Sequence, residues 1–187
     1  MSEEIFAKGK IFELVHVTQD DGRVFEVARR APGVRVIIED KLAGKLLLTK
    51  EFRHELGTWD YRLPGGKVFD TLSEYEAFRA TGDDIVEAAK CKAVAEAREE
   101  AGVAVTNIEY IDTSTLGATV EWDLYVFHAD GRSDDTTVRE LEAGERIEEN
   151  AWVTYDEAKQ MILNGVMQEG RVALTLLQWL STRDGGV

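Results

Sequence analysis

The chain has 187 residues, of which 44% are hydrophobic and 31% charged, a composition typical of a globular protein. Its net charge of −14 argues against a nucleic-acid partner, because proteins that bind nucleic acids place clustered Lys and Arg against the phosphate backbone. A single cysteine excludes an internal disulfide, and neither a membrane-spanning run nor a secretory signal is present. We therefore expect one soluble, cytoplasmic domain, residues 1–187, without a membrane partner.

The first part of the chain is predicted to form strands. A turn sequence, Asp20-Asp21-Gly22, separates two β-prone runs and predicts an antiparallel hairpin. Short β-branched or Leu-rich runs predict two more strands. The predicted strands are residues 10–18, 23–30, 34–38 and 45–52, followed by a loop at 57–66.

Helical patterns follow the loop. Asp83 or Asp84 supplies an N-cap for a long helix, and Gly102 is placed to end it. Later segments alternate between strand and helix patterns around a charged loop at 129–146. The predicted helices are 71–80, 85–101, 155–163 and 171–181, and the predicted later strands are 104–112, 120–128 and 151–153. This order predicts an α+β fold with helices packed on a mixed sheet.

Three glutamates share one face at the C-terminal end of the long predicted helix. Glu96, Glu99 and Glu100 are spaced i, i+3 and i+4, so each like-charged pair costs about 0.2–0.5 kcal/mol on an isolated helix. The negative end of the helix dipole adds roughly 0.3–1 kcal/mol per anion. One interpretation is a solvated acidic face relieved by Lys92 and Arg98. The other is a site for a divalent cation, which prefers hard oxygen ligands.

A glycine loop precedes this helix at residues 63–67 (LPGGK). Glycines allow a tight turn and a close approach of the backbone to a ligand or metal. A plain turn after a strand explains the same residues. The loop indicates a ligand or metal site only together with the glutamates that follow it.

Together these motifs resemble the Nudix hydrolases. The box of that family reads Gly, five residues, Glu, seven residues, then Arg-Glu-apolar-x-Glu-Glu-x-Gly-apolar. Here Glu87 is followed by seven residues and then by 95–103 (AEAREEAGV), in register with the end of the box. The Pro-Gly-Gly of the loop matches the start of the box.

The chain departs from the family pattern in two places. Between Gly66 and Glu87 lie 20 residues where the family has five, so residues 67–82 are interpreted as an insertion within the box. Ala95 occupies the position of the family's Arg, which orients the catalytic carboxylates. Arg98, one turn further along, is the candidate replacement.

The resemblance extends beyond the box. Residues 26–34 (EVARRAPGV), 47–53 (LLTKEFR), 59–67 (WDYRLPGGK) and 151–158 resemble the ADP-ribose and nucleoside-diphosphate-sugar pyrophosphatase branch. The resemblance implies a Nudix-type α/β/α sandwich with a mixed sheet and an N-terminal antiparallel strand extension. It also implies a homodimer, with residues 1–35 as the possible dimerisation element.

The resemblance further implies a metal-dependent reaction. Glu96, Glu99 and Glu100, with the carbonyl of Gly65, are expected to bind Mg²⁺ (or Mn²⁺), and Glu99 and Glu100 are also expected to be catalytic. The bound metal would activate a water that attacks a small nucleotide substrate in line. ADP-ribose cleaved in this way gives AMP and ribose 5-phosphate.

The general base in the resembling branch often comes from a glutamate on a loop after the box. Residues 139–145 (RELEAGE) lie in a connection long enough to suggest a function. Glu145 is the first candidate and Glu142 the second. A disordered acidic loop with no catalytic part is the alternative.

Substrate binding is expected from two arginines and two aromatic residues. Arg53 and Arg29 match phosphate oxygens with their guanidinium groups, although ion pairs with nearby Glu26 or Glu51 explain them equally. Phe52 and Trp59 offer a face for a nucleotide base, or they simply pack beside the glycine turn.

Two alternative functions stay open. The same fold hydrolyses other nucleotides, such as dinucleoside polyphosphates, nucleoside triphosphates or a CoA derivative. Alternatively, the chain is a catalytically weak module that binds ADP-ribose. Ala95 favours this second alternative, and the complete set of glutamates opposes it.

Overall fold

A computed structural model of the chain describes residues 1–133, 138–139, 141 and 146–184. Its strands are β1 (Ser2–Lys8), β2 (Phe12–Thr18), β3 (Val24–Arg30), β4 (Gly33–Asp40), β5 (Lys45–Arg53), β6 (Thr58–Arg62), β7 (Thr106–Ser114), β8 (Val120–Glu121), β9 (Leu124–Asp130) and β10 (Ile147–Thr154). Its helices are α1 (Leu72–Thr81), α2 (Ile85–Glu99), α3 (Tyr155–Leu163) and α4 (Gly170–Asp184).

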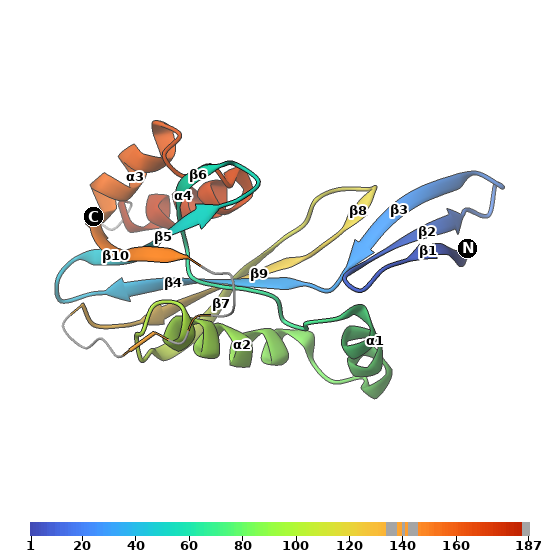
Figure 1. Cartoon of the computed structure of the whole chain (residues 1–187), viewed down its shortest axis with the longest axis horizontal. Coiled ribbons are helices and arrows are strands. Elements are labelled where there is room, and N and C mark those ends of the chain that lie inside the picture. The colour runs from blue at the N-terminus through green and yellow to red at the C-terminus, as the bar shows by residue number, and fades with distance from the viewer. Residues whose placement is uncertain (134–137, 140, 142–145, 185–187) are drawn as a thin grey trace.

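A mixed sheet lies between two helical layers (Figure 1). Its strand order is β10-β5-β4-β9-β7, with β6 paired to β5, and only β4 and β9 run parallel among these pairs. Side chains alternate along β4: Ile37 packs into the core beneath α3 and α4, whereas Val36 and Ile38 pack against α2. These two cores confirm the expected α/β/α sandwich.

The second sheet projects from one end of the sandwich, with the order β1-β2-β3-β8 (Figure 1). The predicted hairpin is confirmed: β2 pairs with β3 from Thr18 opposite Val24, and Gly22 takes a φ of +85° in the turn. Two strands extend the prediction. β1 pairs antiparallel with β2, and the short β8 runs parallel to β3.

Two expectations about individual elements were wrong. Residues 58–62, predicted as loop, form β6, because each of them pairs with β5 from Thr58 opposite Arg53 to Arg62 opposite Thr49. Residues 120–128, predicted as one strand, divide at Trp122 into β8 and β9. The division occurs because the two parts belong to different sheets.

Capping residues mark both ends of helix α2, Asp84 at its start and Gly102 after its end. The Asp84 side chain accepts a hydrogen bond from the Val86 amide at 2.8 Å. Gly102, with a φ of +63°, donates its amide to the Arg98 carbonyl at 3.0 Å. The ordered helix thus ends at Glu99, two residues before the predicted end. None of the described helices is long and apolar enough to cross a membrane.

Candidate functional site

The glycine loop is held between β4 and the end of α2. The Val34 amide donates to the Gly66 carbonyl at 2.9 Å, and the Gly65 amide donates to Oε2 of Glu100 at 2.7 Å. A Cβ added at Gly66 would lie 2.2 Å from Oε1 of Glu96. The absence of a side chain at Gly66 therefore lets the Glu96 carboxylate pack directly on the loop backbone.

The three glutamates at the end of α2, Glu96 and Glu99 in the helix and Glu100 at its C-cap, differ in environment. Glu96 and Glu100 are buried, with 7% and 8% of their surface exposed, whereas the Glu99 side chain is 39% exposed. Nζ of Lys92 lies 2.9 Å from Oε1 of Glu96 and 3.3 Å from Oε2 of Glu99. Burial lowers the pKa of this ammonium, but its hydrogen bond to Glu96 and the charges of both carboxylates outweigh burial and raise it. Lys92 thus offsets the repulsion, as its position predicted.

A cavity of about 210 Å³ opens beside the glycine loop, and we call it the arginine cavity. Gly65, Gly66 and Trp122 form part of its wall. Its charged lining residues are Arg30, Arg35, Arg53, Arg62, Lys67, Glu51, Glu100 and Glu169. The cavity therefore joins Glu100, the C-cap of α2, to a group of cations from β3, β4, β5 and β6.

One side of the arginine cavity is fixed by a buried ion-pair network. Asp60, with none of its surface exposed, accepts from Nε of Arg62 at 2.8 Å and from the Gln168 amide at 2.9 Å. Arg62 also donates to Glu169 at 2.8 Å, and Arg35 lies 3.4 Å from the same carboxylate oxygen. These contacts tie β6 and β4 to the start of α4, which positions both arginines.

On another side of the cavity, two arginines stack on Trp122. The guanidinium carbon of Arg30 lies 4.3 Å from the centre of the indole, and that of Arg171 lies 4.5 Å from it. Burial, together with the charge of Arg35, lowers the pKa of both Arg30 and Arg171. Like charges crowded in a buried place favour binding of an anion.

Several donors in this part of the molecule have no acceptor. Among the described residues, no hydrogen-bond partner exists for four buried nitrogens. They are Nε of Arg30, Nε of Arg35, Nη2 of Arg171 and Nε1 of Trp122. Unpaired buried donors are costly, so their gathering here indicates a site that an anionic ligand satisfies.

The arginine expected to bind phosphate on β5 does line this cavity. Arg53 also forms ion pairs with Glu51 at 2.8 Å and Glu55 at 2.7 Å. Phe52 and Trp59 do not line it. Their rings meet edge to face on the β5–β6 hairpin, with centres 5.4 Å apart. Because side chains alternate along a strand, Phe52 and Arg53 point to opposite faces. The structure thus separates the expected aromatic pair from the arginine cavity.

Arg29 lies apart from the arginine cavity, in the second sheet. Its guanidinium contacts three carboxylates, those of Glu3, Glu13 and Glu121. The hydrogen bond to Glu121 is the main reason why its pKa is raised. Arg29 is thus ion-paired, but among the described residues its partners are these three glutamates and not Glu26 or Glu51, the partners considered above.

Two expected catalytic residues, Glu142 and Glu145, lie outside the described residues. The expected metal ligand Gly65 is beside Glu100, and its carbonyl accepts a hydrogen bond from Arg35. Arg98, the candidate replacement for the arginine missing at Ala95, has an exposed side chain on α2. Lys92 directly contacts both Glu96 and Glu99.

A second group of possible ligands lies away from this site. One ligand atom each of Glu39, His128 and Asp130 falls within 4.8 Å of the others. Glu39, however, already pairs with His128 at 2.7 Å, Tyr155 at 2.6 Å and Arg183 at 3.0 Å. Because a guanidinium already neutralises Glu39, we interpret the group as an internal ion-pair network and not as a metal site.

Comparisons with known proteins agree with this architecture. The phosphonate hydrolase "CMP-5'-(N-acetyl-N-hydroxy-3-aminopropyl)phosphonate hydrolase" of Streptomyces rubellomurinus is 28% identical over 149 residues, 79% of this chain and 64% of that protein. The matched region thus spans less than two thirds of that relative. A crystal structure of an ADP compounds hydrolase has a TM-score of 0.63 at 18% identity, covering 100% of this chain and 95% of the other.

The fold, with a glycine loop packed on an acidic helix end, belongs to the class of mixed α/β/α sandwich domains. The family model described as NUDIX domain matches residues 29–173, most of the chain. The chain therefore belongs to the Nudix family.

Proposed function

We propose that this protein hydrolyses a nucleoside diphosphate linked to a sugar or a similar group, with ADP-ribose as the reference substrate. The products from ADP-ribose would be AMP and ribose 5-phosphate. One observation carries the proposal: the carboxylate of Glu100, at the C-cap of α2, and unpartnered donors of Arg30, Arg35 and Trp122 face the same cavity. Acids that suit a metal thus lie beside cations that suit a diphosphate.

The arginines are proposed to bind and orient the diphosphate. Their fixed forks offer several N–H donors to phosphoryl oxygens, and Arg62 and Arg35 are already positioned by Glu169. An anion here would satisfy the unpartnered nitrogens of Arg30 and Arg35 and relieve their mutual repulsion. Arg53 is proposed to add a further contact from β5. Phe52, Trp59 and Arg29 stay predicted contacts to more distant parts of the substrate.

Glu96, Glu99 and Glu100 are proposed to hold Mg²⁺ or Mn²⁺, with Gly65 as a further ligand. The residues fit a cation, because the Lys92 ammonium already lies between Glu96 and Glu99. When bound, a divalent ion supplies charge at the phosphoryl oxygens and a more acidic water. Glu145, or else Glu142, is proposed to take the proton of the attacking water, while Glu99 and Glu100 complete the catalytic set.

Replacing Lys92 with Met should strengthen Mn²⁺ binding by roughly fivefold, since an ammonium that competes for both carboxylates is worth about 1 kcal/mol at a half-exposed site. Calorimetric titration with Mn²⁺ measures this change. Lys90→Met is the matched control, because Nζ of Lys90 is 3.9 Å from Glu87, outside the glutamate cluster. Weaker Mn²⁺ binding by Lys92→Met would show instead that Lys92 orders the ligands.

A substrate panel tests the proposed substrate class. Kcat/KM should be highest for ADP-ribose or another nucleoside diphosphate sugar, with cleavage within the diphosphate. The panel includes dinucleoside polyphosphates, nucleoside triphosphates and CoA at the same concentration. A preference of more than tenfold for any of those three classes would replace the proposed substrate.

A second substrate class is favoured by one finding. The relative from Streptomyces rubellomurinus is described as a hydrolase of CMP joined to a phosphonate, which is a nucleotide without a sugar at its far end. Cytidine nucleotides linked to a phosphonate therefore belong in the same panel. Faster hydrolysis of such a compound than of ADP-ribose would move the proposal to nucleotides linked to phosphonates.

We also propose that the chain is a single domain whose first 35 residues form a homodimer interface. The outer face of the second sheet exposes large apolar side chains, an arrangement typical of protein contacts. They include Phe6, Phe12, Leu14 and Val24, which are 39–55% exposed. Sedimentation of the full chain should give the mass of a dimer, and a monomer at micromolar concentration would contradict this proposal.

A further inference from the structure

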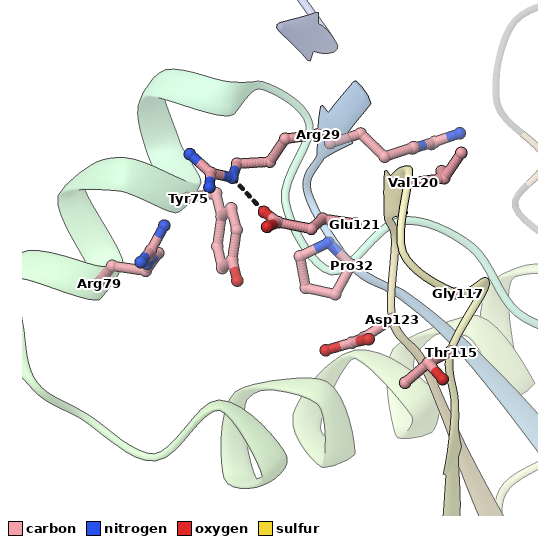
Figure 2. Close-up of a pocket in the computed structure, with 10 residues that line it drawn as sticks. Arg29, Pro32, Tyr75, Arg79, Thr115, Gly117, Val120, Glu121 and Asp123 are labelled. Carbon is pink, nitrogen blue, oxygen red and sulfur yellow. Dashed lines mark hydrogen bonds and ion pairs between the residues drawn. The ribbon is translucent and has the colours of Figure 1, made fainter. Parts of the chain in front are cut away.

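A second cavity, of about 320 Å³, lies between α1, the second sheet and the segment that leads from β7 to β8 (Figure 2). We call it the insertion cavity, because Tyr75 and Arg79 of α1 form one wall and belong to residues 67–82. Thr115, Glu121 and Asp123 contribute polar groups to the opposite side. With Arg29, Arg30 and Pro32, which also line the cavity, these residues come from three separate parts of the chain.

Helix α1 is held firmly enough to form a wall. Leu72 is buried, and its amide donates to the Lys10 carbonyl at 3.1 Å. Thr71 caps the helix by accepting from the Glu74 amide, and Lys8 of β1 contacts Glu76 at 2.5 Å. The helix is thus anchored to the second sheet at its start and along one side.

The insertion cavity adjoins the arginine cavity. Arg30 lines both of them, and the consecutive residues Pro32 and Gly33 line one each. Trp122, under the Arg30 guanidinium, lies in the arginine cavity, whereas its neighbours Glu121 and Asp123 lie in the insertion cavity. A ligand with its diphosphate among the arginines therefore reaches the insertion cavity by passing Arg30.

The groups in the insertion cavity suit a ring that carries hydrogen-bond donors. The phenol of Tyr75, the guanidinium of Arg79 and the carboxylate of Asp123 extend toward the same space (Figure 2). Burial raises the pKa of both Tyr75 and Asp123. An aromatic face beside carboxylate and hydroxyl acceptors suits a sugar or a nucleotide base.

The Asp123 carboxylate has the chemistry of a ligand contact. None of the described residues donates a hydrogen bond to it, and Figure 2 marks no contact between it and the other lining residues. The charge of Arg171 acts on it from outside the cavity lining. The neighbouring Glu121, by contrast, already contacts Arg29. A half-buried acceptor without a hydrogen bond gains most from a donor on a bound molecule.

From this arrangement we infer that the insertion cavity is a specificity subsite, which binds the donor-bearing ring at one end of the substrate. Tyr75 packs against the face of the ring, and Asp123 accepts a hydrogen bond from a hydroxyl or amino group. The inference rests on the proposed diphosphate hydrolysis. It gives residues 67–82 a role, because α1 forms the wall that the shorter box of the family lacks.

Two substrate series test the subsite and tell the sugar from the base. One series keeps ADP and changes the sugar, and the other keeps the sugar and changes the base. Asp123→Asn and Tyr75→Ala should each change the kcat/KM ratio between the best and worst member of one series by about tenfold. They should change the other series by less than twofold. The affected series identifies the ring that the cavity binds.

Controls separate recognition from damage to the fold. Tyr75→Phe should behave as wild type, since it keeps the aromatic face, and Tyr110→Ala removes an exposed tyrosine from β7, outside both cavities. Equal losses in both series, or unchanged ratios in both, overturn the inference. If the wild type hydrolyses no compound, the proposed function fails. Calorimetric binding of the same two series then decides separately whether the subsite exists.

Discussion

Replacing Glu99 with Gln is expected to lower kcat at least about a hundredfold, with thermal unfolding unchanged within about 2 °C. A metal ligand supplies several kcal/mol of transition-state stabilisation, and each 1.4 kcal/mol is a factor of ten. Among the three glutamates, Glu99 is the one whose replacement should disturb the fold least. Its side chain is 39% exposed, and its contact with Lys92 is 3.3 Å long. Steady-state turnover of ADP-ribose with saturating Mg²⁺ measures the loss.

Glu87→Gln provides the control on the same helix. Glu87 is exposed at the first turn of α2, and its nearest cation is Lys90 at 3.9 Å. This variant should keep kcat within about twofold of wild type, since an exposed ion pair contributes little. Equal turnover by Glu99→Gln and wild type would remove Glu99 from the proposed metal set.

Replacing Gly65 with Ala is expected to destabilise the fold by about 3 kcal/mol or more, lowering Tm by about 6–12 °C in a chain of this size. Gly65 has a φ of +149°, a region that side chains rarely adopt. An added Cβ would lie 2.1 Å from the Val34 carbonyl oxygen, which belongs to a central strand and cannot move away cheaply.

Gly57→Ala isolates the effect of that contact. Gly57 also has a positive φ, +63°, but no atom lies within 4 Å of its added Cβ. The Gly57→Ala variant should lose about 1–2 kcal/mol of unfolding free energy, the cost of backbone strain alone. Calorimetric melting of both variants compares them. Equal losses of stability in the two variants would mean that the loop around Gly65 shifts to accommodate the added methyl group without disturbing β4.

Local signals explain which elements could be predicted. The turn at Gly22, the cap at Asp84 and the glycine after α2 each act through neighbouring residues, so their consequences are visible in the sequence. Strand β6 was missed because it pairs only with β5 and buries alternate charged residues, Asp60 and Arg62. Its hydrophobic pattern therefore does not resemble that of a half-buried strand.

Some residues of the candidate site could likewise be predicted from the sequence, and others could not. The glutamates and the glycine loop follow recognisable spacing, whereas Arg35, Trp122 and Glu169 carry no local signal of their own. They meet only because β4, the segment before β9 and the start of α4 come together in the fold. Arg30 and Arg62 stood within segments that resemble the family, but nothing in those segments indicated that both line one cavity.

The aromatic residues show the limit of sequence proximity. Phe52 is adjacent to Arg53, and both were expected to contact the substrate. Alternation along β5 directs Arg53 to the arginine cavity and Phe52 toward Trp59 on the other face. Side chains of neighbouring residues in a strand point to opposite faces. Only a ligand that extends around the hairpin could therefore contact both Phe52 and Arg53.

The most direct test of the central claim is the release of AMP from ADP-ribose by the full chain, in Mg²⁺ and in excess EDTA. Metal-dependent hydrolysis at the glutamate cluster predicts AMP and ribose 5-phosphate in equal amounts with Mg²⁺. It predicts none above background with EDTA, and recovery when Mg²⁺ is restored. Equal release in EDTA would contradict the metal's role, and tight binding of ADP-ribose without any release in Mg²⁺ would contradict hydrolysis.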